Sequence, residues 1–456
     1  MRINATGCLV IERISNTTHG KKYKHEAQAS GLVKFRSTRL RFVLVLVLIS
    51  VSSFAGSSTA AERIDTYPGG GKRAVYTLDD AGRYDGPFQR FHPNGSPHIA
   101  GSYRNGQIHG EYVERDASGG LVHAASFADG KLHGGHQQYV GRTRIRDEVW
   151  LHGTLIAPKS AAQIRARLDE ISKLPVRTVG KVPAAGAFVK AVVNDAARHS
   201  DRERAVRRIM TYRYLCDLPY EDIALDRTQI AHVVAACQML RKVGKLAHKP
   251  ENPGMTEAEY KFALKGTSSS NLHRSTRLSV PKSIDAYMFD SDKANIARLG
   301  HRRWCLNPSM QKTGIGSAGN FTAMWSFDRT RRNIPDYQYV AFPPRGLMPA
   351  TLVKNEHAWN VSLNPTKFSK PKQEAVKVKV YPAQLSFRGP SLEKASTPLK
   401  LDFFAVNLMG FGIPNCIIFR PEGVKTSSGS AYWVAITGLK TTAGKAASVE
   451  YLVAFF

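Results

Sequence analysis

The sequence is poor in cysteine, in acidic residues and in long apolar runs, and each shortage excludes a class of protein. Five cysteines in 456 residues are too few for a small disulfide-dense fold. No run of about 20 apolar residues follows residue 61, which excludes a protein with several membrane-spanning helices. Only 36 acidic residues face 65 basic ones, and the net charge of +29 favours an anionic partner or surface.

The chain nevertheless has enough apolar residues to build packed cores. A hydrophobic share of 42% with 9% aromatics excludes a mainly disordered protein. A chain of 456 residues is too long to fold around one hydrophobic core of ordinary size, so we expect two to four structural units. Strand-like and helix-like stretches occupy different parts of the chain, which predicts an α+β multidomain protein.

The N-terminal sixty residues have the pattern of an export signal. Arg39 and Arg41 precede a short apolar run at 42–51, and small residues end at Ala61. This order predicts a secretory signal peptide over 42–61, with a single membrane anchor as the alternative. We then expect residues 1–41 to be an N-terminal extension that results from a start codon assigned too early. The remainder of the chain has a net charge of +22. We therefore expect an exported protein, in the periplasm, the cell envelope or outside the cell.

A repeat of period 24 occupies residues 72–156. Gly86, Gly110 and Gly134 share this spacing, and Asn-Gly, Ser-Gly or Asp-Gly pairs separate short alternating strands. Such pairs are a strong hairpin signal, and because one hairpin cannot bury its own face, we expect a small solenoid of stacked hairpins. The repeat words resemble bacterial MORN-type repeats, and this resemblance implies a contact surface for a protein partner.

Histidines recur within the repeat, and a linker follows it. His109, His133 and His152 could form a ladder of metal ligands, but their fixed place in the repeat favours a role in turn packing. Residues 157–200 are rich in Ala, Lys and Pro and predict a partly ordered linker with one helix at Ala161–Lys173.

The stretch 201–345 changes to helical periodicity. Asp201 is a candidate cap for a helix that ends near Cys216, and a second helix starts near Asp226. His248 lies 18 residues after Ile230, which is five helical turns, so it falls in line with the buried face at the end of this second helix. Helical geometry alone makes His248 a histidine at the edge of the core.

A third helix and the second histidine follow. Pro281 and Ser283 mark the helix start, and Ile284, Tyr287 and Met288 would face inward. The words "K-L-A-H-K-P", "S-S-N-L", "I-D-A-Y-M-F-D", "G-H-R-R-W-C-L-N-P" and "G-I-G-S-A" then stand in an order that resembles the CAP superfamily of cysteine-rich secretory, antigen 5 and pathogenesis-related proteins. The resemblance covers 201–345 and implies an α-β-α sandwich with two histidines and two acids in a cleft.

The resemblance assigns site residues by position. His248 and His301 match the two histidines, and Asp290 matches one acid by its spacing from Tyr287. The other acid is missing, because Ser270 stands before Asn271 and Leu272. The resemblance therefore gives a cleft formed by His248, His301, Asp290, Ser270 and Asn271.

Two functions fit this set of residues. Two imidazoles and a carboxylate could hold Zn²⁺ and a water, as in a metal-dependent hydrolase with His248 and His301 as ligands. The missing acid removes the obvious general base, and the sequence has no G-x-S-x-G or papain-type cysteine motif. We therefore expect binding rather than catalysis: an exported protein whose cleft holds a small apolar or lipid-like ligand or a protein partner. Apart from zinc in the alternative, no cofactor is implied.

The C-terminal residues 371–456 consist of short strand-like segments separated by Gly, Pro and Ser, which predict an immunoglobulin-like β-sandwich.

Four cysteines follow the signal segment and allow three complete disulfide pairings: Cys216, Cys237, Cys305 and Cys416. We expect Cys305 to be buried or paired. No RRM, KH or zinc-finger motif accompanies the basic residues, so nucleic acid is not the expected partner. We expect the basic residues to meet anionic envelope polymers or lipid headgroups instead.

Overall fold

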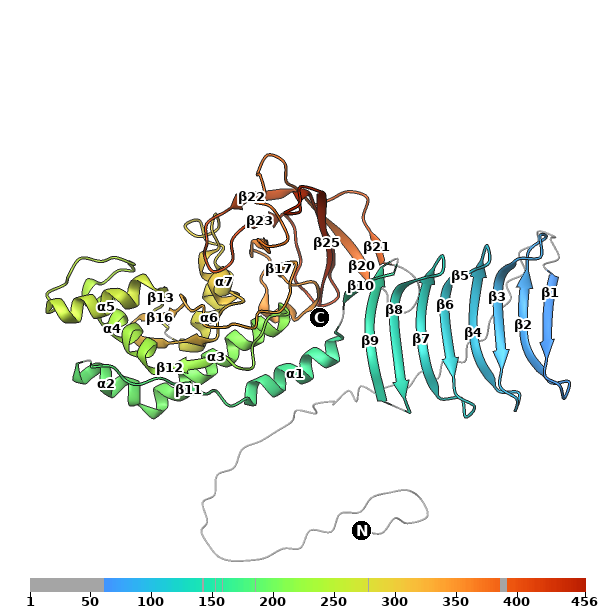
Figure 1. The fold of residues 1–456 in the computed structure, drawn as a ribbon, viewed down its shortest axis with the longest axis horizontal. Coiled ribbons are helices and arrows are strands. Elements are labelled where there is room, and N and C mark those ends of the chain that lie inside the picture. Colours follow the sequence, from blue (N-terminus) through green and yellow to red (C-terminus); the bar gives the residue numbers. More distant parts are fainter. Residues whose placement is uncertain are drawn as a thin grey trace, which may run out of the picture. The chain divides into compact units, whose positions relative to one another are not determined.

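The computed structural model describes residues 61–141, 143–151, 153–157, 159–184, 186–277, 279–385 and 392–456. These residues form a mixed α/β structure with five sheets, most of them antiparallel (Figure 1). The expected N-terminal extension and nearly all of the expected signal segment lie outside the described residues. In the part of the chain that is described, no helix is both long and apolar enough to cross a membrane.

The repeat forms one antiparallel sheet in which the strands follow each other in chain order (Figure 1). Its strands are β1 (Ala61–Thr66), β2 (Lys72–Leu78), β3 (Tyr84–Phe91), β4 (Pro97–Arg104), β5 (Gln107–Ile108), β6 (Gly110–Arg115), β7 (Leu121–Ala128), β8 (Lys131–Val140), β9 (Thr143–Leu151) and β10 (Thr154–Ala157). Asn105-Gly106 and Asp129-Gly130 have positive φ at both residues, 50° and 77° and then 49° and 76°. Left-handed pairs of this kind match the strand twist, so the predicted hairpin turns are confirmed here.

The helices are α1 (Ala161–Lys173), α2 (Ala187–Asn194), α3 (Ala196–Leu215), α4 (Arg227–Val243), α5 (Glu257–Ser268), α6 (Val280–Phe289) and α7 (Gly300–Cys305). Helix α1 has the predicted bounds, and Ser160 with Gln163 forms a capping box at its start. The predicted cap Asp201 is wrong: Asp195 caps α3 by accepting from the backbone N–H of Arg198. Asp226 caps α4 as expected.

A small antiparallel sheet lies between helices in the central part of the chain. It runs in the order β13 (Ser270–Arg274), β16 (Phe321–Trp325) and β15 (Ile315–Ala318). Leu272 and Ala323 pack against Val233 and Cys237 of α4. On α6, Ile284, Tyr287 and Met288 are buried as predicted. A second small sheet joins β11 (Thr178–Val179), β12 (Ala224–Asp226) and β14 (Lys312–Thr313) in parallel.

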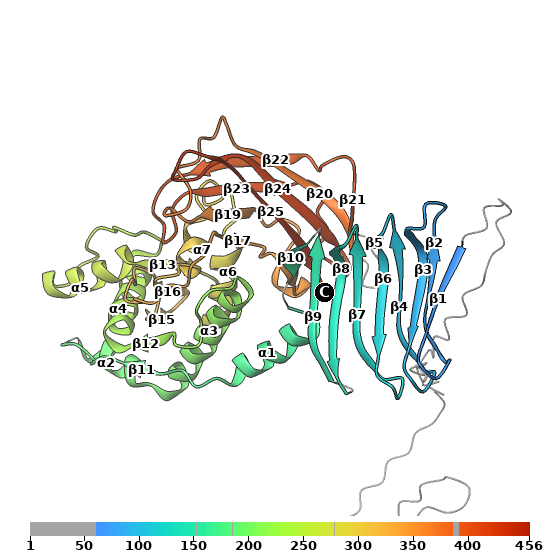
Figure 2. The same ribbon diagram turned by 45° about the vertical axis from the view of Figure 1, so that its right-hand side comes forward.

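The C-terminal part contains two sheets (Figure 2). One has the order β17 (Tyr339–Phe342), β19 (Trp359–Leu363), β23 (Cys416–Pro421) and β22 (Leu401–Asn407). The other has the order β18 (Gly346–Met348), β25 (Ala446–Phe455), β24 (Ala431–Lys440), β20 (Lys377–Leu385) and β21 (Leu392–Lys394). Trp359 of the first sheet meets Tyr432 of the second at a ring distance of 5.7 Å. Residues 339–363 therefore contribute three strands that precede the expected boundary at residue 371.

Helix α7 is attached to the first of these sheets by two buried arginines. Arg302 donates to the carbonyl of Ala358 at 2.6 Å and to Oδ1 of Asn360 at 3.0 Å. Arg303 donates through Nε to the carbonyl of Ile413 at 2.8 Å. Both side chains are buried. Their guanidinium groups are satisfied by carbonyl and amide oxygens, and α7 is thereby fixed against β19.

His357 makes the stability of this region sensitive to acid. Its ring is 3% exposed and contacts Phe289 at a ring distance of 4.9 Å. Burial, followed by the charge of Arg302, lowers the pKa of His357 to about 3. Because the folded state favours the neutral ring, this contribution is present above the unfolded pKa of about 6.5 and is lost as the pH falls toward 3.

Below pH 6, the free energy of unfolding should therefore fall by up to about 1.4 kcal/mol per pH unit on account of His357. Urea titrations at several pH values would measure this slope. In His357→Asn the same region of the profile should be flatter. Equal slopes in wild type and variant would contradict the assignment.

Candidate functional site

His248 and His301 line the same two adjoining cavities, of about 250 and 480 Å³. Both cavities are also lined by Asn295 and Arg298. We call the two together the histidine cavity. Two histidines that lie 53 positions apart in the sequence therefore line the same cavity.

His301 is held by a buried carboxylate. Its Nδ1 lies 2.7 Å from Oδ1 of Asp290, whose side chain is fully buried. Asp290 is the left-handed C-cap of α6, with φ of 42°, and its Oδ2 accepts from the backbone N–H of Arg302. A carboxylate can only accept here, so Nδ1 of His301 carries the proton. Nε2 is then the nitrogen left for a ligand.

His248 is held by backbone rather than by a carboxylate. Its Nδ1 lies 2.8 Å from the carbonyl of Thr267, and the hydroxyl of Thr267 donates back to the carbonyl of His248. The prediction that His248 ends helix α4 is wrong, because Gly244 takes the left-handed conformation and stops the helix at Val243. A carbonyl also requires a proton on Nδ1, so Nε2 of His248 is available in the same way.

Ser270 and Asn271 have different roles on strand β13. Asn271 donates through Nδ2 to the carbonyl of His301 at 3.0 Å and so ties β13 to α7. Ser270 lines the smaller cavity, and its buried hydroxyl has no hydrogen-bond partner among the described residues. Buried polar groups are nearly always paired, which makes this hydroxyl available to a molecule in the cavity.

Three positively charged or titratable residues that were not predicted also line the larger cavity: His273, Arg274 and Arg298. Burial, and then the charge of His301, lowers the pKa of His273. The alternation of β13 could have found His273, since it lies two residues after Asn271 on the same face.

An aromatic wall closes the smaller cavity. Trp304 of α7 stacks on Phe327 at a ring distance of 4.5 Å, and Phe411 lines the same space. Phe411 comes from the loop between β22 and β23, more than a hundred residues after Trp304. No local sequence pattern could have predicted its place, because its contact with the cavity depends on how α7 docks on the C-terminal sheet.

The donor set does not fit a zinc ion held by three protein ligands. Within the described ranges, no three side chains of His, Cys, Asp or Glu are grouped so that they could hold a metal. Asp290, the third ligand of the hydrolase hypothesis, already accepts from His301 and from the N–H of Arg302. Its role is to orient His301.

The four described cysteines are unpaired and buried: Cys216, Cys237, Cys305 and Cys416. Burial raises the pKa of Cys216 to about 12 and raises that of Cys305 as well. A buried thiol with a raised pKa is unreactive, so Cys305 is not a nucleophile.

We expect these four thiols to resist iodoacetamide in the native protein and to be labelled within minutes after unfolding in guanidinium. Peptide mass spectrometry without reducing agent would locate the label. A disulfide between any two of them, or labelling of the native protein at Cys305, would contradict the structure.

Among the repeat histidines that the structure describes, neither His109 nor His133 belongs to a group of three possible metal ligands. Nδ1 of His109 accepts from the backbone N–H of Asp129 at 3.3 Å, which joins it to the next turn, as predicted. His133 is buried within β8, and His152 lies outside the described residues.

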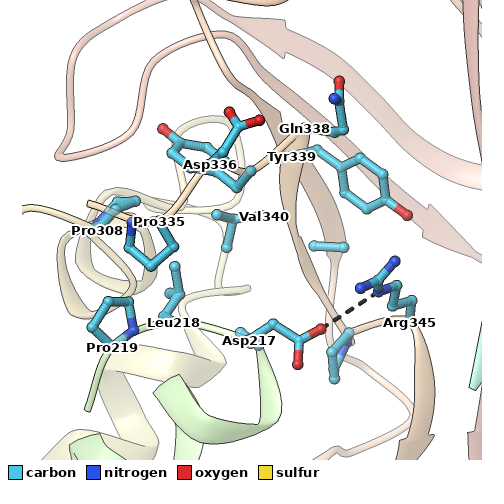
Figure 3. Close-up of a pocket in the computed structure, with 14 residues that line it drawn as sticks. Asp217, Leu218, Pro219, Pro308, Pro335, Asp336, Gln338, Tyr339, Val340 and Arg345 are labelled. Carbon is cyan, nitrogen blue, oxygen red and sulfur yellow. Dashed lines mark hydrogen bonds and ion pairs between the residues drawn. The ribbon is translucent and has the colours of Figure 1, made fainter. Parts of the chain in front are cut away.

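A separate cavity of about 230 Å³ lies between the end of α3 and residues 335–345 (Figure 3). Three prolines, Pro219, Pro308 and Pro335, lie on one side, and the Asp217–Arg345 ion pair lies on the other. Asp217 also pairs with Lys159. Because its charges are neutralised within the protein, this cavity is a weaker candidate than the histidine cavity.

Comparisons with known proteins add little. No family model matches the chain, and no curated protein matches it. The fold has a similarity to the crystal structure of an extracellular protein containing an SCP domain from Bacillus anthracis strain Ames, with 12% sequence identity and a TM-score of 0.22. The alignment covers 57% of this chain and 87% of that one. A similarity this low establishes neither a shared fold nor a shared function.

Proposed function

We propose that the protein is an exported binding protein whose histidine cavity holds a small ligand with an apolar, lipid-like part. The observation that carries this proposal is the joint lining of one cavity by His248 and His301, each with Nδ1 engaged by the protein. A fixed Nδ1 leaves each Nε2 able to accept a hydrogen bond from a ligand, or to donate one when the ring is protonated. The order of motifs that resembles the CAP superfamily supports the same function.

The lining of the cavity indicates the kind of ligand. Trp304, Phe327 and Phe411 contribute apolar surface to the lining. Arg298 and the two histidines contribute polar and basic groups to it. Binding sites of this type are mainly apolar with a few polar groups that fix orientation. A molecule with an apolar body and a polar or anionic group would match both kinds of side chain, and the unpaired hydroxyl of Ser270 would gain a partner.

The runner-up is hydrolysis, and one observation favours it. A histidine whose Nδ1 is bound to a buried carboxylate is the arrangement of a general base. Catalysis also requires a nucleophile and donors for a developing oxyanion. Ser270 is only 3% exposed and makes no hydrogen bond with either histidine among the described contacts, so we favour binding.

Native mass spectrometry of protein isolated from its own host without detergent would test the proposal. We expect a bound small molecule in the wild type and binding at least about tenfold weaker in His301→Ala. His199→Ala is the matched control, because His199 lies on α3 outside the cavity and its side chain is 38% exposed. Equal ligand occupancy in both variants would contradict the proposal. A single zinc ion lost only with His301 would favour the hydrolase.

A further inference from the structure

Exposed apolar side chains gather at the histidine cavity. The described residues include seven large hydrophobic side chains that are strongly exposed, and four of them belong here: Leu246 at 44%, Phe327 at 52%, Leu408 at 46% and Met409 at 59%. Leu246 and Phe327 line the cavity themselves. Leu408 and Met409 lie within three residues of Phe411, which also lines it. We call these four side chains the apolar rim.

The loop that carries Leu408 and Met409 is fixed rather than free. Arg303 donates to Oδ1 of Asn407 at 2.9 Å, to the carbonyl of Met409, and to that of Ile413 at 2.8 Å. Asn407 in turn donates to the carbonyl of Ala297 at 3.0 Å. With its backbone bound to a buried guanidinium, the loop holds two apolar side chains in water, at a free-energy cost that a binding partner would remove.

Basic side chains accompany the apolar rim. Lys245 precedes Leu246, Arg329 follows Phe327 by two positions, and Arg298 lines the cavity between them; all three are exposed. The guanidinium of Arg329 lies 5.9 Å from the ring centre of Trp304, so this charge is close to the aromatic wall. Asp292 is an acidic residue of the same region, and its Oδ1 and Oδ2 accept from Ala294 and Asn295. Its carboxylate keeps its negative charge, but the three basic side chains named above outnumber it.

We propose that the apolar rim is a docking surface for an anionic lipid bilayer. Leu246, Phe327, Leu408 and Met409 would enter the boundary between headgroups and acyl chains, while Lys245 and Arg329 would meet the headgroups. Apolar side chains flanked by cations are the combination that binds a protein to an anionic membrane surface. The net charge of +22 that remains without residues 1–41 acts in the same direction. This inference concerns the surface, and it holds whether or not the cavity contains a ligand.

Co-sedimentation of the full chain with vesicles tests this surface. Vesicles of phosphatidylcholine with phosphatidylglycerol should bind the protein more tightly than phosphatidylcholine alone. The double variant Leu408→Ser/Met409→Ser should bind at least about tenfold more weakly. The matched control is Ile64→Ser/Val140→Ser in the repeat sheet, where the side chains are 48% and 66% exposed. Arg329→Gln should lose about fivefold, on anionic vesicles only.

Hydrogen exchange separates docking by the rim from attachment by the apolar run at 42–51. Anionic vesicles should protect peptides that contain 245–249, 327–329 and 408–412. Equal binding of the rim and control variants, or no protection in those peptides, would overturn the proposal. Self-association of the vesicle-free protein that disappears in Leu408→Ser/Met409→Ser would overturn it too, because the rim would then be an interface between copies.

Discussion

Replacing Arg302 with alanine should lower the free energy of unfolding by about 3–5 kcal/mol. The guanidinium is fully buried, and among the described residues no carboxylate forms an ion pair with it. Its donors reach two segments of the chain, through the carbonyls of Met288, Phe289 and Ala358 and the side chains of Ser291 and Asn360. Ser291 Oγ and the carbonyl of Phe289 would keep other donors. Alanine would remove the guanidinium donor from the remaining oxygens in a dry interior, and each group left unsatisfied costs about 1–3 kcal/mol.

Urea unfolding followed by circular dichroism would measure this loss. Arg332→Ala is the control, because Arg332 is exposed, and its effect should stay within about 0.5 kcal/mol. Burial lowers the pKa of Arg302 to about 10, which reflects the cost of holding its charge away from water. A loss below about 1 kcal/mol in Arg302→Ala would mean that α7 is not attached in this way.

Gly266→Ala should lower the free energy of unfolding by about 1–3 kcal/mol and should also disturb the site. A Cβ at this position would lie 2.1 Å from the carbonyl oxygen of His232 and 2.8 Å from Cβ of Ala236. Both contacts are with α4, so the added methyl would push α5 away from α4. Thr267 is the next residue, and it binds His248 through two hydrogen bonds.

The same urea experiment measures the stability of Gly266→Ala, and ligand occupancy measures the site. Gly410→Ala is the matched control, because no atom lies within 4 Å of a Cβ added there. We expect the control to keep wild-type stability. Should Gly266→Ala unfold like wild type, α4 and α5 cannot cross as closely as described.

The parts of the fold that depend on neighbouring residues in the sequence were predictable. The Asn-Gly and Asp-Gly pairs predicted hairpins because a left-handed pair of residues strongly favours them. Pro281 and Ser283 predicted the start of α6, which Ser279 caps, and the spacing of Ile284, Tyr287 and Met288 predicted its buried face. The two histidines and Asp290 followed from the resemblance, and the structure brings them to one place.

Other features depended on contacts between distant segments. Helical periodicity predicts a helix that continues past Gly244 to His248. This prediction fails because a sequence pattern does not show that Gly244 adopts the left-handed conformation and ends the helix. The sequence does not show that Arg302 and Arg303 are buried, because the carbonyls that bind them belong to Ala358 and Ile413, which lie 56 and 110 positions further along the chain. Phe411 could not be placed for the same reason: it lies between β22 and β23 and lines the cavity together with residues more than a hundred positions earlier in the chain.

A crystal structure of the protein with the molecule that it captures in its own host would test the shared cavity most directly. The account predicts density for one small molecule in contact with Nε2 of His248 and Nε2 of His301, with its apolar part against Trp304 and Phe411. Density in contact with only one of the two imidazoles, or in another cavity, would contradict it.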